Sequence, residues 1–263
     1  EVRAAAAMTV GRLWLAIGEP LKAALHLEEA LKVLGLAPET RGGKVLRIQC
    51  HTSRVECFRL LGDKEWRDIE LKLMRDATSL LSGSDRAYWA AEHYALRAEI
   101  CLDEGRLVDL RASAKEAADA LGRIEASKVN SIRTPELYLK VAFLLLEAGD
   151  ADGALAELEG PARALVDRWP RVTTVLTHRA LLLRTHLVRR DKESAFAEGK
   201  TIVAELAKGE ALPRMAELRV REALSLAGDQ GMPDFDHLGN LERVVLLARE
   251  TGRPLRISVN LAN

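Results

Sequence analysis

The chain has 263 residues and carries 39 Lys and Arg against 39 Asp and Glu, so its formal net charge is zero. A balanced total supplies no basic excess for nucleic acid or for an anionic membrane, which argues against a dedicated DNA-binding protein. The composition is 48% hydrophobic, 30% charged and only 4% aromatic, and its abundance of Ala, Leu, Glu, Arg and Lys favours helices.

The apolar positions follow helical periodicity almost throughout, which predicts about twelve helices in six antiparallel pairs. We expect the first helix to end at Ala16 and Ile17, where Gly18 closes it. Pro20 suits the first turn of the next helix, because proline lacks the N–H that this turn leaves unbonded. The second helix is then expected from Leu21 to Leu34.

Start and stop residues also separate the later pairs. Asp63 follows Gly62 and is predicted to cap a helix, and a third pair is predicted to open at Ser84-Asp85. The clearest start is Thr134-Pro135-Glu136, which combines a cap, a first-turn proline and a first-turn acid. Further breaks are expected at Gly105, Gly149-Asp150, Arg190-Asp191 and Gly228.

Four of these break glycines recur at intervals of 44, 43 and 44 residues: Gly18, Gly62, Gly105 and Gly149. A period of this length is the mark of a helical repeat. We therefore predict an all-α fold, a right-handed α-solenoid of about six antiparallel helix pairs, formed as one domain by residues 1–252. Residues 253–263 do not have a helical pattern and are predicted to be a non-helical, truncated tail.

Small and large residues alternate along the two helices of the first pair: Gly11, Trp14, Gly18, Ala23, Leu27 and Ala30. This pattern resembles the motif of a tetratricopeptide repeat. The fourth pair matches similarly but has Pro161 where a small residue is usual. The common repeat has about 34 residues, and longer repeats look like those of large bacterial signalling and regulatory proteins, in which effector domains are attached.

The resemblance implies a concave groove, lined by the first helix of each pair, that holds a peptide. The positions that align with it are Arg12, Gln49, Thr52, Glu56, Arg59, Glu92, Glu99, Asp103, Glu136, Phe143 and Arg184. A structural alternative remains open, in which each is an ordinary solvated residue of an amphipathic helix. The family's clamp for a C-terminal carboxylate needs Asn at such positions, and none is present, so we do not expect that kind of partner.

Three cysteines, Cys50, Cys57 and Cys101, form no tight pair, which indicates reduced thiols and a cytoplasmic protein. His51 lies beside Cys50, but Cys50 and Cys57 are too far apart in the sequence to form the closely spaced cysteine pair of a zinc site. Because they are two helical turns apart, we expect both cysteines on one buried face, in the core. The longest apolar run, from Val141 to Leu146, is far shorter than a membrane span. No secretion signal opens the chain, which lacks a starting Met and is expected to be a fragment.

No phosphate-binding glycine loop, nucleophile elbow or paired acid and base can be recognised, so we expect neither an enzyme nor a cofactor. Our leading hypothesis is a scaffold that binds a protein or peptide, without nucleic acid or membrane. The alternative is the ligand-sensing arm of a larger bacterial regulator or defence protein, such as an ATP-dependent switch, a transcriptional regulator or a protease-associated protein.

Overall fold

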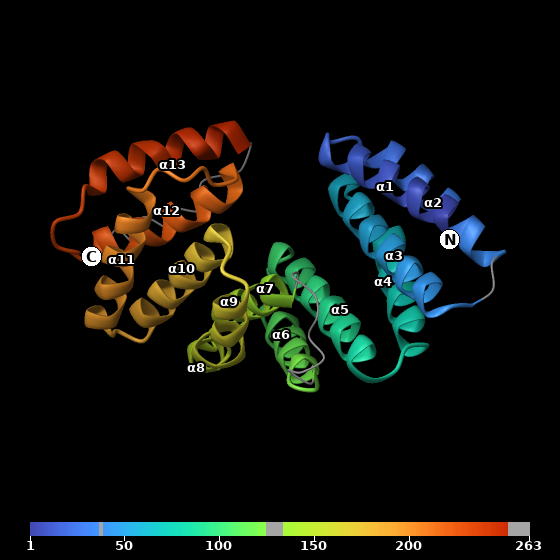
Figure 1. Ribbon diagram of the computed structural model, residues 1–263, viewed down its shortest axis with the longest axis horizontal. Coiled ribbons are helices and arrows are strands. Elements are labelled where there is room, and N and C mark those ends of the chain that lie inside the picture. Colours follow the sequence, from blue (N-terminus) through green and yellow to red (C-terminus); the bar gives the residue numbers. More distant parts are fainter. Residues whose placement is uncertain (37–38, 125–133, 252–263) are drawn as a thin grey trace. The chain divides into compact units, whose positions relative to one another are not determined.

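The computed structural model describes residues 1–36, 39–124 and 134–251, and the expected tail at 253–263 lies outside them (Figure 1). These described residues are all-helical and contain no strand, which confirms the predicted all-α class. The chain divides into two compact units, Glu1–Asn130 and Ser131–Asn263. Within each unit the helices pack neighbour to neighbour in the manner of an α-solenoid.

The first unit contains three helix pairs. Their bounds are α1 (Val2–Ala16), α2 (Pro20–Gly35), α3 (Arg41–Leu61), α4 (Lys64–Ser79), α5 (Gly83–Asp103) and α6 (Leu107–Leu121). Each odd-numbered helix packs on the helix that follows it, and contacts of α2 with α3 and of α4 with α5 join successive pairs. In this unit α3 and α5 are therefore each held between two second helices.

The second unit repeats this plan with an interrupted second helix. Its elements are α7 (Thr134–Glu147), α8 (Ala151–Glu157), the π-helical turn η2 (Leu158–Ala162), α9 (Arg163–Arg168), α10 (Val172–Val188), α11 (Lys192–Leu206), α12 (Arg214–Asp229) and α13 (His237–Thr251). The turn η2 contains Pro161, which cannot donate a helical hydrogen bond, and Gly160 has non-helical torsion angles there. Pro161 therefore divides what would be one long helix.

The break residues have the conformation that ends a helix. Gly18, Gly62, Gly105 and Gly149 have φ of 84°, 73°, 69° and 81°, a left-handed region that side chains with a Cβ seldom adopt. Arg190 takes the same conformation without being glycine. The predicted cap at Asp63 is also confirmed, because its side chain accepts a hydrogen bond from the backbone N–H of Trp66.

Two predicted boundaries were wrong. The helix α5 begins at Gly83, one residue before the predicted Ser84-Asp85. The break expected at Gly228 comes two residues later, because α12 continues to Asp229 and the left-handed residue is Gly231. A Cβ on Gly228 would lie 2.2 Å from the ring of His237, so this glycine allows close approach of α13 rather than ending a helix.

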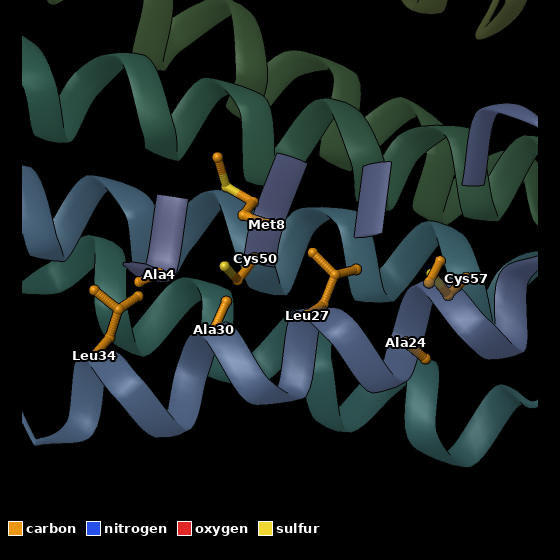
Figure 2. Close-up of a cluster of buried hydrophobic side chains, with 9 residues drawn as sticks. Ala4, Met8, Ala24, Leu27, Ala30, Leu34, Cys50 and Cys57 are labelled. Carbon is orange, nitrogen blue, oxygen red and sulfur yellow. The ribbon is translucent and has the colours of Figure 1, made fainter. Parts of the chain in front are cut away.

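A core of small and large apolar residues lies where the first three helices meet (Figure 2). A Cβ added to Gly11 of α1 would lie only 2.9 Å from Leu27 Cγ and 3.2 Å from the carbonyl oxygen of Ala23, both on α2. Gly11 thus lets the two helices approach, as the repeat pattern predicts. Cys50 and Cys57 of α3 are fully buried in the same core, which confirms their structural interpretation.

Candidate functional site

All eleven predicted groove residues lie on first helices of pairs, and most of them are half-buried. Five of them occupy equivalent positions, because each lies six residues before the left-handed residue that ends its helix. They are Arg12, Glu56, Glu99, Phe143 and Arg184, which precede Gly18, Gly62, Gly105, Gly149 and Arg190. Phe143 and Arg184 contact each other in the second unit, and in the first unit Glu56 and Glu99 both lie within 4 Å of Arg59. Two clusters result, one in each unit.

In the first unit Arg59 is the centre of an ionic cluster. Its Nε lies 2.6 Å from Asp103 Oδ2 on the neighbouring first helix α5. Its Nη1 lies 3.3 Å from Glu56 Oε2 and 3.9 Å from Glu99 Oε2. These four residues, named here the Arg59 cluster, were all predicted for the groove, and they bridge α3 and α5.

Burial of Arg59 would by itself lower the pKa of its guanidinium, because it disfavours the charged form. The charges of Glu56 and Asp103 outweigh burial and raise that pKa instead. The side chains of Glu56 and Asp103 remain 34% and 39% exposed. The Arg59 cluster is therefore a fixed set of charges that an incoming partner can still reach.

A second bridge shows that α3 and α5 run in register. Arg41 Nη2 lies 2.9 Å from Asp85 Oδ1 at the start of the two helices, and both this pair and Arg59–Asp103 are separated by 44 residues. Arg41 and Arg59 are 18 residues apart, which is five complete turns at about 3.6 residues per turn. Residues 44 apart therefore face one another at both ends of α3 and α5, one residue more than the 43-residue interval from Gly62 to Gly105.

The cluster in the second unit joins α7 and α10. Arg184 Nη2 lies 2.6 Å from Glu147 Oε1, and its guanidinium carbon lies 5.6 Å from the centre of the Phe143 ring. Phe143 and Arg184 were predicted, whereas Glu147 was missed. Its position four residues after Phe143 places it on the same face of a helix, which is the signal that could have identified it.

The other predicted residues contribute less. Arg12 Nε donates to Ser53 Oγ at 3.2 Å, which joins α1 to α3. The Thr52 hydroxyl donates to the carbonyl of Ile48 in its own helix. Within the described residues, Gln49, Glu92 and Glu136 are not joined to either cluster: the first two are half-buried, and Glu136 is exposed in the first turn of α7.

A buried polar network behind this surface was not predicted. Glu70 of α4 accepts from Arg54 Nε at 2.7 Å and lies 2.7 Å from His51 Nδ1, and Arg54 Nη1 also donates to the carbonyl of Ala24 at 3.1 Å. Glu70 is 2% exposed, and Arg54 and His51 are each 7% exposed. Arg54 lies on the apolar stripe of Cys50 and Cys57, and a charge at such a position indicates a buried partner.

His93 is the buried group with the clearest pH response. Burial on α5 lowers its pKa to about 4, and the charges of Arg75 and Arg97 act in the same direction. The ordinary value is 6.5, so as the pH falls below it the unfolded chain takes up a proton before the folded chain does. The stability that neutral His93 contributes is complete above about pH 6.5 and is lost progressively between about pH 6.5 and 4.

We therefore expect the wild-type chain to lose about 2 kcal/mol more stability than His93→Gln between about pH 7.5 and pH 5. Urea unfolding at both pH values measures this difference. The acid Glu104, whose pKa is lowered to about 2 by its hydrogen bond to Arg67, titrates below this window. Equal losses in the two proteins would show that His93 is not held neutral.

The described residues offer no group of three His, Cys, Asp or Glu that could hold a metal ion. Nor, over the same residues, is any helix long and apolar enough to cross a bilayer. No protein-family model matches the sequence, and no curated protein matches it. The candidate site thus depends on its geometry alone: charged and aromatic side chains at equivalent positions of parallel helices.

Proposed function

We propose that the chain is a tetratricopeptide-like scaffold that binds a protein or peptide on the faces of its first helices. The observation that carries this proposal is the Arg59 cluster, in which Glu56 and Glu99, at equivalent positions of α3 and α5, both lie within 4 Å of Arg59 and the carboxylates remain partly exposed. Packing alone does not require successive helices to present charge at the same register. A binding surface that extends along several helices does.

The charges of the Arg59 cluster favour a basic partner. Three carboxylates and one guanidinium give it a formal charge of 1 − 3 = −2. Such a surface attracts Lys- or Arg-bearing segments and repels acidic ones, so that its charge determines partner choice and association rate. Arg59 also holds the carboxylates in place, which reduces the cost of ordering them on binding.

The second unit supports the same role with a different chemistry. Phe143, Glu147 and Arg184 combine an aromatic face with an ion pair, which suits a segment that has both apolar and polar side chains. Neither cluster needs a cofactor or a catalytic group. The three cysteines are free and buried, which supports a reducing, cytoplasmic location for this scaffold.

The proposal predicts that charge reversal at Glu56 and Glu99 weakens binding. Peptides are first selected for binding to the wild-type chain from a random displayed library, and their affinities are then measured by calorimetry. We expect Glu56→Lys/Glu99→Lys to bind the selected peptides at least about tenfold more weakly, because like charges then meet across the interface. The milder Glu56→Gln/Glu99→Gln variant should lie between the two.

The matched control changes the same amount of charge elsewhere. Glu65 on α4 and Asp119 on α6 are exposed acids of second helices, and Glu65→Lys/Asp119→Lys should leave the affinity unchanged. Melting curves check that all variants are folded, and the exposed control substitutions should change stability by only about 0.5 kcal/mol. If the control loses affinity and the groove variant retains it, the binding surface lies on the second helices and the proposal fails.

A further inference from the structure

One face of α5 carries a regular row of acids. Asp85, Glu92 and Glu99 follow one another at intervals of seven residues, and Asp103 comes four residues after Glu99. Seven residues are close to two turns of a helix, so the four side chains lie along one face of α5. All four are at least partly exposed. We name them the α5 acid row, and this row lies beside α3, because its first and last members bond to arginines of that helix.

Arginines of α3 pair with the two ends of the α5 acid row but not with its middle. Arg41 bonds to the first acid, and Arg59 bonds to the last and approaches the third. Glu92, the second acid, forms no ion pair within the described residues. The residue of α3 that stands 44 positions before Glu92 is Ile48, which is fully buried. The row is thus neutralised at its ends and keeps a negative charge between them.

The other bases of α3 contact different groups. Lys44 and Arg47 lie 3.8 Å and 3.5 Å from carboxylate oxygens of Glu39, which precedes the helix. Arg54 is buried and bonds to Glu70 at 2.7 Å. A cation that binds at the middle of the α5 acid row would therefore find a carboxylate that no base of α3 already occupies.

An aromatic ring lies one turn before Glu92. Tyr88 is half-buried and stands four residues earlier, so the two side chains are neighbours on the same face of α5. A carboxylate accepts charge-assisted hydrogen bonds from Lys or Arg, and the face of an aromatic ring attracts the same cations. Tyr88 and Glu92 therefore form a position for one basic side chain. Along α5 this position lies seven residues, or about 10.5 Å, from Glu99 of the Arg59 cluster.

We propose that the partner of this scaffold is an α-helix with two Lys or Arg residues seven positions apart, one pairing with Glu92 and the other with the Arg59 cluster. This proposal rests on the function proposed above and names the chemistry of the partner. In a helix, residues seven apart lie on one face and advance about 10.5 Å, which is the separation of Glu92 from Glu99. Because both helices have the same rise, their charges stay matched along α5, whereas an extended segment advances more than twice as far per residue.

The seam between α3 and α5 is not an end face of the row of repeats. Each of these two helices already packs on the helices before and after it: α3 on α2 and α4, and α5 on α4 and α6. A further repeat would extend the row and leave this seam open. The occupant is therefore defined by the charge of the α5 acid row and not by exposed apolar area.

Two labelled peptides of about 20 residues, a length at which alanine-rich sequences form helices, test this spacing. Both are built from alanine and glutamine and carry two lysines, placed seven positions apart in one peptide and five apart in the other. The second spacing puts the lysines on different faces of a helix. Each peptide is titrated with the full chain at low ionic strength, where exposed charges are least screened, and binding is followed by fluorescence anisotropy. We expect the wild-type chain to bind the seven-spaced peptide about fivefold more tightly.

Glu92→Gln should remove this preference, because the amide has the same shape and no charge. Glu65→Gln is the matched control and should retain the preference, since Glu65 is an exposed acid on α4, outside the seam. Absence of binding, equal affinity of the wild-type chain for both peptides, or a preference that survives in Glu92→Gln would overturn the inference. Tighter binding of an extended, proline-rich peptide with lysines three positions apart would overturn it as well.

These results differ from a failure of the proposed function, whose test is Glu56→Lys/Glu99→Lys with the library-selected peptides. If that variant loses affinity while lysine spacing and Glu92→Gln have no effect, the chain binds on its first helices and only the helical, seven-spaced partner is wrong. If that variant retains full affinity for the selected peptides, the proposed function fails and this inference fails with it.

Discussion

Replacing Glu70 with alanine is expected to lower the free energy of unfolding of the first unit by about 3–5 kcal/mol. The substitution leaves the guanidinium of Arg54 buried beside His51 without the carboxylate that both contact. Because Arg54 also bonds to the Ala24 carbonyl of α2, the damage reaches the contact between the first two pairs. Urea unfolding followed by tryptophan fluorescence measures the loss, since Trp14, Trp66 and Trp89 all lie in the first unit.

Glu65→Ala supplies the control for this prediction. Glu65 is an exposed acid on the same helix, and its loss should change stability by no more than about 0.5 kcal/mol. If Glu70→Ala proves as mild as Glu65→Ala, water reaches Arg54 in the variant and the network is not a buried one.

Ala23→Leu is expected to cost about 1–3 kcal/mol, because it overpacks the contact between α1 and α2. Ala23 is fully buried, and its backbone carbonyl already lies within 3.2 Å of where a Cβ on Gly11 would be. The larger side chain has to separate the two helices or leave its preferred rotamer. A lower melting temperature of the first unit is the expected result.

The matched control is Ala112→Leu on α6, where the alanine is exposed and the same substitution should be within about 0.5 kcal/mol of neutral. An unchanged melting curve for Ala23→Leu would contradict the alignment of the first pair with the small, large, small pattern of the repeat.

Most helix boundaries could be predicted because local chemistry determines them. Glycine in the left-handed region and an aspartate that caps the next helix act within a few residues, as at Gly62 and Asp63. Gly228 misled the prediction because its role depends on His237, which lies beyond the end of the helix. The π-helical turn at η2 was also missed, although Pro161 already departed from the repeat pattern.

The sequence predicted which helices carry the residues of the candidate site, but not which of their side chains form ion pairs. The repeat period correctly assigned Glu56, Arg59, Glu99 and Asp103 to first helices that lie side by side. Which carboxylate pairs with which base depends on side-chain rotamers and on the spacing of α3 and α5, and no single-sequence pattern encodes these. The buried Glu70 network was missed for the same reason, since its three charged or titratable members come from two helices.

Hydrogen–deuterium exchange of the chain with and without a library-selected peptide tests the central proposal most directly. Binding on the first helices predicts slower exchange in α3 and α5, residues 41–61 and 83–103, with little change in α4 and α6. The same protection should be reduced in Glu56→Lys/Glu99→Lys at equal peptide concentration. Protection confined to α4 and α6 would contradict the proposal, because the peptide would then lie on the second helices.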